Sequence, residues 1–264
     1  MDLGIQGKIA VVTGSTAGIG FAIASVLAQE RAEVIVSGRS AERVNSAVEA
    51  IRDRAKSKSV RGVAADLGTL TGVESFQKQV TKADVLVNNL GIFEPKAFLE
   101  IPDQDWFRFF EVNVMSGVRL SKHYLPGMVE RKWGRIIFIS SESAQQTPTE
   151  MVHYGMTKTA QVAVARGIAQ SVAATGVTVN SLLVGPTASE GVAEYVKGLA
   201  QQQKITAAEV EKQFFSSVRP SSLLKRFETP EEVAAVVAFV ASTQAATING
   251  SAVRAEGGVI QSIL

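Results

Sequence analysis

A tyrosine and a lysine four positions apart, Tyr154 and Lys158, form the first pair of side chains in this sequence that could move a proton. They lie in a segment with a helical spacing of apolar residues, so both should project from one face of a helix. A phenol with a pKa of about 10 is a poor base at neutral pH, and a nearby ammonium group would stabilise its ionised form. Because such a pair is common by chance, its meaning depends on the residues around it.

Two further polar residues lie where they could join this pair. Ser141 closes a predicted strand, at the carboxyl edge where open parallel sheets bind ligands. Asn113 is a polar residue among apolar neighbours, and we expect it in the long helix that precedes this strand. The four side chains together could polarise an oxygen atom and exchange a proton with it.

A glycine-rich loop near the N-terminus is suited to phosphate groups. The first predicted strand, Ile9–Thr13, continues into Thr13-Gly14-Ser15-Thr16-Ala17-Gly18-Ile19-Gly20, and a predicted helix, Ile19–Gln29, follows. Glycines let the backbone turn sharply and approach a pyrophosphate, while the free N–H groups of the helix start favour anions. The loop could be a tight turn and nothing more, but its place between the first strand and the first helix favours dinucleotide binding.

The end of the second predicted strand indicates which dinucleotide is bound. NAD sites place an acid about 20 residues after the glycine loop, where it binds the ribose 2′-hydroxyl. This chain has Gly38 and Arg39 instead, and a guanidinium can bind a 2′-phosphate through two hydrogen bonds. Ser15 or Ser40 could add a further contact. We therefore expect NADP(H), although a solvated arginine at the start of the next helix would look the same.

Short apolar runs alternate with longer helical patterns along almost the whole chain. Runs without alternation, such as Val85-Leu86-Val87, indicate strands that are covered on both faces. Repeated strand–helix–strand units form right-handed parallel crossovers. We therefore predict an α/β fold with a single Rossmann-type, doubly wound parallel sheet of about seven strands, helices on both faces, and one domain over residues 1–264. The predicted strands are Ile9–Thr13, Glu33–Ser37, Val60–Ala64, Asp84–Asn88, Arg135–Ser140, Thr178–Leu183 and Ser251–Ala255.

One segment, 187–222, interrupts this rhythm. It has a helical pattern, is rich in Gln, Ala and Lys, and is longer than an ordinary crossover, which is typical of a lid over a site. After it, Thr229-Pro230-Glu231-Glu232 has the N-cap, the first-turn proline and the acids that open a helix. Two other helices are predicted over Ala41–Arg54 and Ala160–Ala173.

The composition excludes several classes of protein. The 264 residues are 46% hydrophobic and 20% charged, which is typical of a soluble globular protein. The net charge of +2 is spread along the chain, so we expect no nucleic-acid partner. Cysteine is absent, which excludes disulfides and thiolate sites. With no export signal and no apolar stretch of about 20 residues, we expect a cytoplasmic protein without a membrane partner. The acids Glu100, Asp103 and Asp105 resemble a metal site in composition only, so we expect no metal.

Taken together, these motifs resemble those of the classical short-chain dehydrogenase/reductase family over the whole length of the chain. Their co-occurrence is specific for the family and for the type of reaction, but not for the substrate; 3-oxoacyl-[acyl-carrier-protein] reductases are among the members. The matching segments are Thr13–Gly20, Asp66, Asn88-Asn89-Leu90-Gly91, Asn113, Ser141, Tyr154-x-x-x-Lys158 and Glu256-Gly257-Gly258.

The resemblance implies a role for each matching residue. Tyr154 would be the general acid in reduction and the base in oxidation, with its pKa lowered by Lys158. Ser141 would polarise the substrate oxygen, and Asn113 would anchor a water chain that supplies protons through Lys158. Ser140 would point away, because the usual separation from the tyrosine favours Ser141. The implied cofactor-binding residues are Gly14, Ser15, Thr16, Gly18, Ile19, Gly20, Arg39, Asp66, Leu67, Asn89, Gly91, Tyr154, Lys158 and Thr187, with Ser189 as a further candidate.

The match is imperfect at two places. Leu90 replaces a small alanine, and we expect it to alter the packing beside the nicotinamide pocket. Val184-Gly185-Pro186-Thr187 stands where Pro-Gly is usual. His153 should be a pocket or interface residue, and His123 should be structural. The residues expected to line the substrate pocket are Phe93, Ser143, Gln145, Thr149, Met151 and the segment after Thr187.

We therefore expect an NADP(H)-dependent oxidoreductase that transfers hydride between nicotinamide and a carbonyl or secondary alcohol, in a homotetramer or homodimer. The alternative is a nucleotide-binding regulator or scaffold with the same fold and little catalysis. The intact set of Asn113, Ser141, Tyr154 and Lys158 argues against this alternative, since a sensor needs no phenol–ammonium pair. The sequence leaves open the substrate, the physiological direction, the strictness for NADP over NAD, and the choice between dimer and tetramer.

Overall fold

The computed structural model describes residues 2–263 and contains one parallel sheet of seven strands. The strand order is β3-β2-β1-β4-β5-β6-β7, so the direction of winding reverses between β1 and β4, as expected for a doubly wound sheet. The predicted strands are confirmed with ends that differ by one residue at most. They are β1 (Ile9–Val12), β2 (Glu33–Gly38), β3 (Val60–Ala64), β4 (Val85–Asn88), β5 (Gly134–Ser141), β6 (Val177–Val184) and β7 (Ala252–Ala255).

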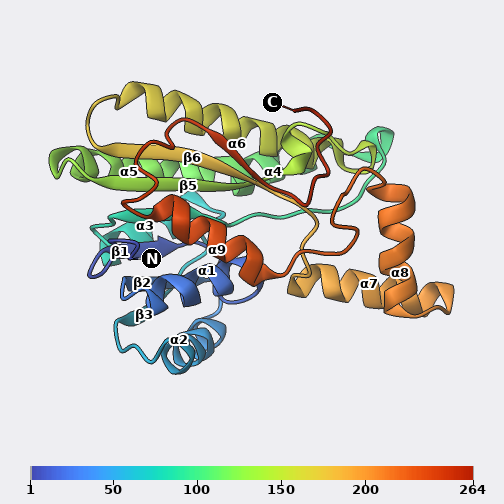
Figure 1. Ribbon diagram of the computed structural model, residues 1–264, viewed down its shortest axis with the longest axis horizontal. Helices are drawn as coiled ribbons and strands as arrows, with labels where there is room; N and C mark the ends of the chain where they lie inside the picture. The colour runs from blue at the N-terminus through green and yellow to red at the C-terminus, as the bar shows by residue number, and fades with distance from the viewer. Residues whose placement is uncertain (1, 264) are drawn as a thin grey trace.

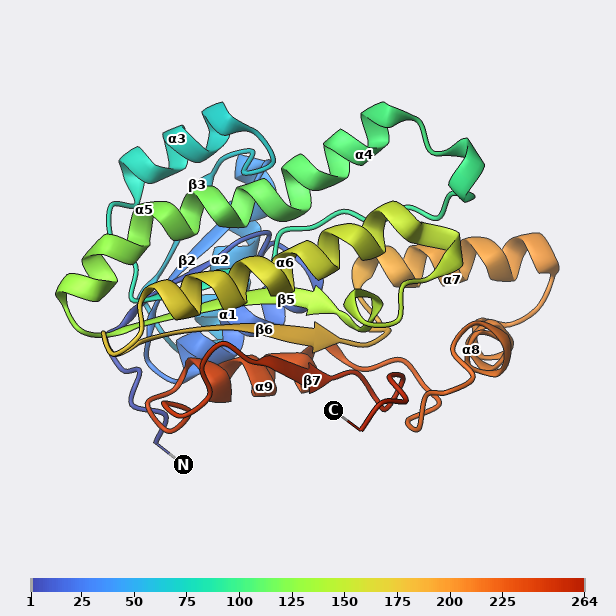
Figure 2. The same ribbon diagram turned by 90° about the horizontal axis from the view of Figure 1, so that it is seen from above.

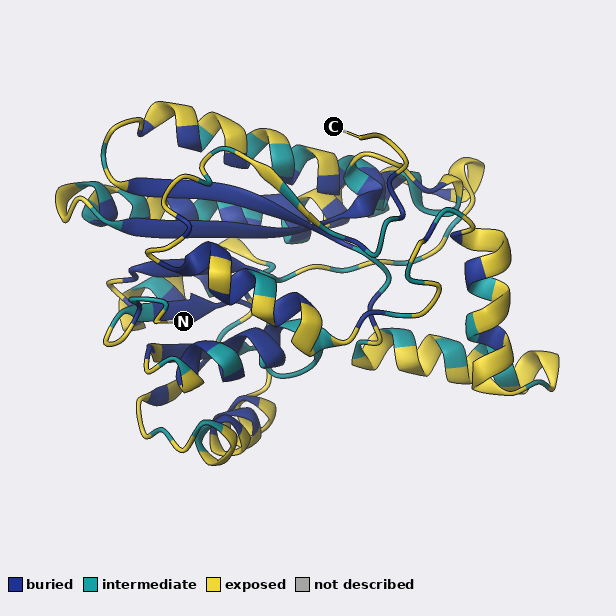
Figure 3. Cartoon of the chain, viewed as in Figure 1, coloured by how far each residue is buried: buried dark blue, intermediate teal, exposed yellow. Residues whose placement is uncertain are grey.

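The central strands are buried because helices cover both faces of the sheet. In β1, Ala10 and Val12 pack into the apolar cluster on one face, while Val11 packs into the cluster on the other. All three are fully buried, which is why their sequence is continuously apolar and does not alternate. In Figure 3 the two longest strands, β5 and β6, are buried along most of their length.

The helices divide between the two faces as the chain winds back and forth (Figure 1 and Figure 2). On one face lie α1 (Gly18–Gln29), α2 (Ala41–Ala55) and α9 (Pro230–Ala241). On the other face lie α3 (Leu70–Gln79), α4 (Asp103–Phe110), α5 (Ser116–Glu130) and α6 (Val152–Ser171). No helix among residues 2–263 is long and apolar enough to cross a membrane.

The helix predicted around Asn113 has an unexpected break. A π-helical turn, Glu111–Met115, joins α4 to α5 and contains Asn113. A π-helical turn holds one extra residue per turn, so it shifts the following helix face relative to the preceding one. Such turns are often found at functional sites, and this one positions a fully buried amide next to α6.

The segment 187–222 is helical, as predicted, and lies beyond the carboxyl ends of β5 and β6 (Figure 2). It contains α7 (Glu190–Gln203), α8 (Ala207–Gln213) and a second π-helical turn, Phe214–Val218. None of the residues in α7 is buried in this chain, so α7 contributes little to the core. The segment therefore forms a wall over the carboxyl edge of the sheet.

The N-terminus of α9 has a capping box, formed by Thr229 and Glu232, whose contribution to stability can be tested. Thr229 accepts a hydrogen bond from the Glu232 amide at 3.2 Å, and the Glu232 carboxylate bonds back to the Thr229 amide. We expect Thr229→Ala to lower the free energy of unfolding by about 1 kcal/mol, because α9 packs against α1 in the core. Chemical denaturation would measure the change.

The matched control is Thr206→Ala, which removes the same capping geometry from α8. Because α8 has one buried residue where α9 has six, the control should lose less than half as much stability. Equal losses in the two variants would contradict this interpretation of α9.

Candidate active site

Two cavities lie side by side at the carboxyl edge of the sheet. Successive residues of the loop after β4 separate them, since Asn89 and Gly91 line the larger cavity and Leu90 lines the smaller one. The larger cavity has a volume of about 820 Å³ and the smaller about 160 Å³. The larger cavity is lined by Ser141, Tyr154 and Lys158, together with Ile19, Thr187 and the lid. Their arrangement fits an elongated ligand that reaches from one cavity into the other.

The glycine loop has the conformation that a phosphate-binding turn requires. Gly14 has φ of 60° and Gly18 has φ of 55°, a region that favours glycine. A Cβ added to Gly20 would lie 2.4 Å from the Gly14 carbonyl oxygen, so only glycine fits there. Helix α1 then begins at Gly18 without a side-chain cap and without an acid in its first turn. Its free N–H groups and positive end fit a bound phosphate.

Ser15 supports this loop from inside and does not face either cavity. Its hydroxyl donates to the Val12 carbonyl at 2.7 Å and accepts from the Ser37 amide at 2.9 Å. It is fully buried, so its side chain joins β1 to β2 and is not available to a 2′-phosphate. The expectation that the Ser15 hydroxyl could bind this phosphate is therefore wrong.

The smaller cavity fits the adenosine end of a dinucleotide. It is lined by Thr16, Arg39, Asp66 and Leu67, and the Arg39 guanidinium has no hydrogen-bond or ion-pair partner among residues 2–263. Leu90 also lines this cavity and not the larger one, although its neighbours Asn89 and Gly91 line the larger cavity. The cause is the turn of the loop after β4, where the Leu90 amide donates to Thr13 Oγ1 at 2.8 Å. Its expected effect on packing beside the nicotinamide stays a prediction.

The proposed catalytic residues meet at the end of β5. Lys158 is 5% exposed, and its Nζ donates to the Ile139 carbonyl at 2.9 Å. Ser140 donates to the Lys158 carbonyl at 2.9 Å, so its hydroxyl is directed into the β5–α6 contact. Ser141 and Tyr154 both line the larger cavity, and the Ser141 hydroxyl acts to lower the pKa of the phenol.

The electrostatics of the Tyr154–Lys158 pair differ from the sequence-based expectation. Burial lowers the pKa of Lys158 to about 8, against the opposite effect of Glu142. Burial raises the pKa of Tyr154, and the negative charge of Glu142 raises it further. The ammonium lies 5.4 Å from the centre of the phenol ring and is bonded to a carbonyl group. Burial therefore outweighs any acidifying effect of Lys158 on the phenol.

Asn113 fastens the π-helical turn to its surroundings with every polar atom of its side chain. Its Oδ1 accepts from the Ile92 amide at 2.7 Å, and its Nδ2 donates to the Ile92 carbonyl and to Thr157 Oγ1, both at 3.0 Å. A Cβ added to Gly91 would lie 3.5 Å from Asn113 Oδ1 and 3.6 Å from Lys158 Nζ. Asn113 and Lys158 therefore face the same point of the loop after β4.

Gln161 is a buried neighbour that sequence reasoning missed. Its Nε2 donates to the Asn113 main-chain carbonyl at 2.6 Å. Its Oε1 is buried without a hydrogen-bond partner among residues 2–263. The only signal in the sequence was its position three residues after Lys158, on the same helix.

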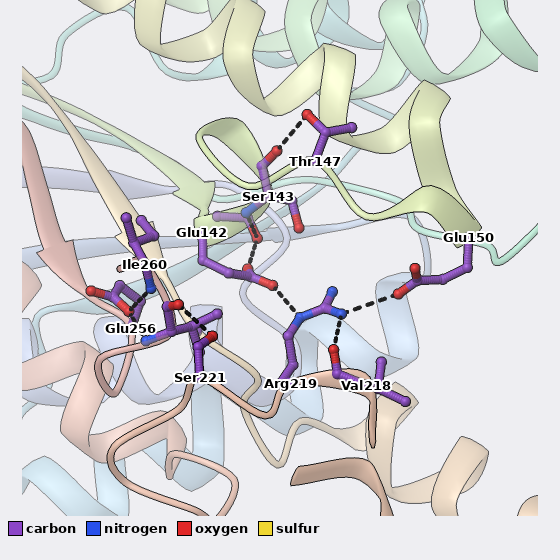
Figure 4. Close-up of polar contacts among 12 residues, drawn as sticks. Glu142, Ser143, Thr147, Glu150, Val218, Arg219, Ser221, Glu256 and Ile260 are labelled. Atoms are coloured by element: carbon purple, nitrogen blue, oxygen red, sulfur yellow. Dashed lines mark hydrogen bonds and ion pairs between the residues drawn. The ribbon is translucent and has the colours of Figure 1, made fainter. Parts of the chain in front are cut away.

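An ion-pair cluster around the buried Arg219 was also missed (Figure 4). Arg219, from the lid, donates to Glu142 at 3.0 Å and to Glu150 at 3.2 Å. Glu142 directly follows Ser141, and its carboxylate accepts the Ser141 hydroxyl proton. A charged residue next to Ser141 was the available signal for Glu142, but Arg219 lies too far along the chain for any local pattern to connect them.

Thr187 and Ser189 lie where the lid begins. Thr187 is buried, lines the larger cavity and donates to the Gly185 carbonyl at 3.0 Å. Ser189 also lines this cavity, and its hydroxyl caps α7 by accepting from the Val192 amide. Both side chains therefore fix the path of the chain at the wall of the larger cavity.

Four of the five residues named as expected lining of the substrate pocket do line the larger cavity. The larger cavity is lined by Phe93, Ser143, Thr149 and Met151, but not by Gln145.

The two histidines lie outside the cavities. His153 is fully buried against Trp106 and Phe109, so it lines neither cavity, and burial lowers its pKa. His123 is exposed on α5, with its ring against Tyr124. The acids around residue 100 are not gathered as ligands: within 2–263 no group of three or more His, Asp or Glu could hold a metal ion.

Comparisons with known proteins agree with this geometry. The family model described as short chain dehydrogenase matches residues 8–200. The chain is 46% identical to an uncharacterized oxidoreductase, YvaG, of Bacillus subtilis, with both chains covered completely. It is 32% identical to the 3-oxoacyl-[acyl-carrier-protein] reductase FabG of Aquifex aeolicus, covering 98% of this chain and 100% of the relative.

Solved structures are similar over the full length as well. The structure of L-sorbose reductase from Gluconobacter frateurii, complexed with NADPH and L-sorbose, superposes with a TM-score of 0.90 at 32% identity and covers 100% of both chains. A putative NAD(P)-dependent gluconate 5-dehydrogenase from Beutenbergia cavernae, with bound NADP, superposes with a TM-score of 0.86 at 29% identity, covering 99% of this chain and 100% of the other.

A buried acid next to Thr187, Glu228, makes stability depend on pH. Glu228 is 6% exposed, and burial raises its pKa from 4.5 to about 7. Between these values the folded protein keeps a proton that the unfolded chain releases. The stability contributed by Glu228 is therefore lost as pH rises through this window.

We expect Glu228→Gln to be more stable relative to the native protein at about pH 8 than at about pH 5, because the amide stays neutral. Thermal unfolding across this range would measure the difference. Glu194→Gln, which changes an exposed acid on α7, is the control and should show no such trend. A constant difference between Glu228→Gln and the native protein at all pH values would contradict the assignment.

Proposed function

The chain belongs to the short-chain dehydrogenase family, and we propose that it is an NADP(H)-dependent oxidoreductase acting on a carbonyl or secondary alcohol. The observation that carries this proposal is the opening of Ser141, Tyr154 and Lys158 onto one cavity beside the glycine loop. The chain would act as one NAD(P)-binding domain, with 187–222 as the lid. A nucleotide-binding regulator would have no use for these three groups in a ligand-sized cavity. The cytoplasmic location stays a prediction.

The proposed proton transfer follows from the protonation states of the Tyr154 phenol and the Lys158 amine. NADPH, when bound, supplies the hydride that reduces the carbonyl carbon. Tyr154 donates its proton to the carbonyl oxygen, so that the alcohol forms without a free alkoxide. Because its pKa is raised in the free protein, the phenol holds this proton at neutral pH. Ser141 stabilises the same oxygen by a hydrogen bond.

Resupply of the proton involves the buried end of the site. Lys158, with its pKa lowered to about 8, is still mostly protonated at neutral pH but gives up its proton more readily than an ordinary lysine. Asn113 lies on the same side of Gly91 as Lys158 and would anchor a water molecule near the lysine. The unpaired Oε1 of Gln161 adds an acceptor for such a water molecule.

The oligomer that we propose is a homotetramer or homodimer. Around α4, Leu99 is 94% exposed and Phe107 is 73% exposed, and both lie near the partly exposed Phe98 and Phe110. A surface with several large apolar side chains is typical of an interface. Light scattering should therefore give a mass of two or four chains, and a mass of a single chain at all concentrations would reject the proposal.

Tyr154→Phe tests the acid directly. The variant keeps the ring and loses the proton, so we expect turnover to fall by about a hundredfold to ten-thousandfold. NADPH binding should be retained, because the glycine loop is untouched. Steady-state NADPH oxidation and fluorescence titration would measure the two properties, and unchanged turnover would refute the assignment.

Arg39→Ala tests the choice of cofactor. Loss of a charge-assisted pair with the 2′-phosphate should weaken NADPH binding by about tenfold to a hundredfold. NADH binding should change little, since NADH has no phosphate at that position. Arg43→Ala is the matched control, because Arg43 is already paired with Glu190 at 2.7 Å. Equal losses for NADPH and NADH in Arg39→Ala would overturn the role of Arg39.

A further inference from the structure

We propose that the substrate is an uncharged carbonyl compound, or the corresponding alcohol, with a second hydroxyl on the carbon next to the reacting one, and that Glu142 binds this hydroxyl. This inference rests on the proposed function. It assigns to Glu142 a specificity role that follows from its contacts with Ser141 and Arg219.

The first observation is the position of the carboxylate. Glu142 is 4% exposed and lines the larger cavity beside Ser141. Its Oε1 accepts from Arg219 Nε at 3.0 Å, and its Oε2 accepts from the Ser141 hydroxyl. A charged acceptor is thus fixed one hydrogen bond away from the group that must bind the reacting oxygen.

The second observation is that the single Ser141 hydroxyl proton has two possible acceptors, the Glu142 carboxylate and the substrate carbonyl oxygen. In this structure the proton is donated to Glu142, while Ser141 Oγ accepts from the Ser143 amide at 3.1 Å. To polarise a substrate carbonyl, the hydroxyl must turn its proton away from Glu142. The buried Oε2 then loses the only hydrogen-bond donor it has among residues 2–263, which is unfavourable.

A second hydroxyl on the substrate resolves this conflict. Oxygens on neighbouring carbons are spaced much as two hydrogen-bonded oxygens are, and Ser141 Oγ and Glu142 Oε2 are themselves hydrogen-bonded. The substrate carbonyl can therefore accept from Ser141 while the adjacent hydroxyl donates to Glu142. A ketone without this hydroxyl leaves the carboxylate unsatisfied.

The third observation is the charge of the cavity wall. Besides Lys158, the charged residues that line the larger cavity are Glu142, Glu150 and Arg219. Arg219 donates to both carboxylates and to the Val218 carbonyl, and its side chain is 9% exposed (Figure 4). It is therefore not free to bind an anion. A substrate carboxylate in the place of the second hydroxyl would lie against the Glu142 carboxylate, which would repel it.

The test compares matched four-carbon ketones that differ only at the carbon next to the carbonyl. The probes are butan-2-one, 1-hydroxybutan-2-one and 2-oxobutanoate, with a second series of the same three kinds built on six carbons in case the cavity requires a longer chain. NADPH oxidation gives kcat/KM for each. For the native protein we expect the hydroxyketone to exceed the plain ketone by about tenfold or more, and the oxo acid to be the poorest.

Two variants separate the effect of the contact between Glu142 and the substrate hydroxyl from the effect of removing a carboxylate that pairs with Arg219. Glu142→Gln should reduce the hydroxyketone preference by about tenfold, because a charge-assisted hydrogen bond becomes a neutral one. It should also improve the use of the oxo acid, because the negative charge that repels the oxo acid is removed. Glu150→Gln removes a carboxylate that also pairs with Arg219 but has no contact with Ser141. It should keep the native preference for the hydroxyketone.

The inference would be overturned if the native protein used plain and hydroxylated ketones equally well, or if it preferred the oxo acid. Either result would still support the proposed oxidoreductase function. An unchanged preference in folded Glu142→Gln would overturn the role of Glu142. If the native protein binds NADPH but reduces none of the six probes, the inference fails and the proposed function is weakened with it. The native series decides the substrate class even if a variant does not fold.

Discussion

The arrangement of the candidate site depends on a lysine side chain, Lys158, that is almost fully removed from water. Burying an unpaired charge is costly, and Lys158 meets this cost by donating to the Ile139 carbonyl at the end of β5. That bond requires α6 to pack closely on β5, and the Ser140 hydroxyl tightens the same contact. Once the helix is fixed in this way, Tyr154 one turn earlier must open onto the cavity where β5 ends at Ser141.

The lid is joined to this centre through charge, besides the apolar contacts of Val210 and Phe215. Helix α7 has no buried residue, yet Arg219 at the end of the lid is buried between Glu142 and Glu150. The same carboxylate that holds the lid also holds the Ser141 proton. The orientation of the Ser141 hydroxyl and the position of the lid are therefore linked at Glu142.

Much of the fold could be predicted from the sequence because strands buried on both faces are recognisable as continuous apolar runs. The glycine loop and the N-terminal cap of α9 could also be predicted from the sequence, because each needs particular residue types at fixed positions. The π-helical turn at Asn113 was not, because one extra residue in a helix leaves no clear mark on apolar spacing. The inward direction of Ser15 and the place of Leu90 depend on loop conformation, and the contact between Arg219 and Glu142 spans 77 residues. The site residues themselves came from a family pattern, and only their placement is visible in the structure.

The most direct test of the acid–base pair is a titration of the Tyr154 phenol by its ultraviolet absorbance, with and without NADP⁺. In the free protein, burial and Glu142 should keep this phenol protonated to above pH of about 10. Since the oxidised nicotinamide ring is positively charged, its binding beside Lys158 should lower the pKa of the phenol toward neutrality. We expect one tyrosine per chain to ionise well below the others only when NADP⁺ is bound, and this signal should be absent in Tyr154→Phe. Identical titrations with and without NADP⁺ would contradict the claim that a phenol made acidic in this pocket carries the reaction.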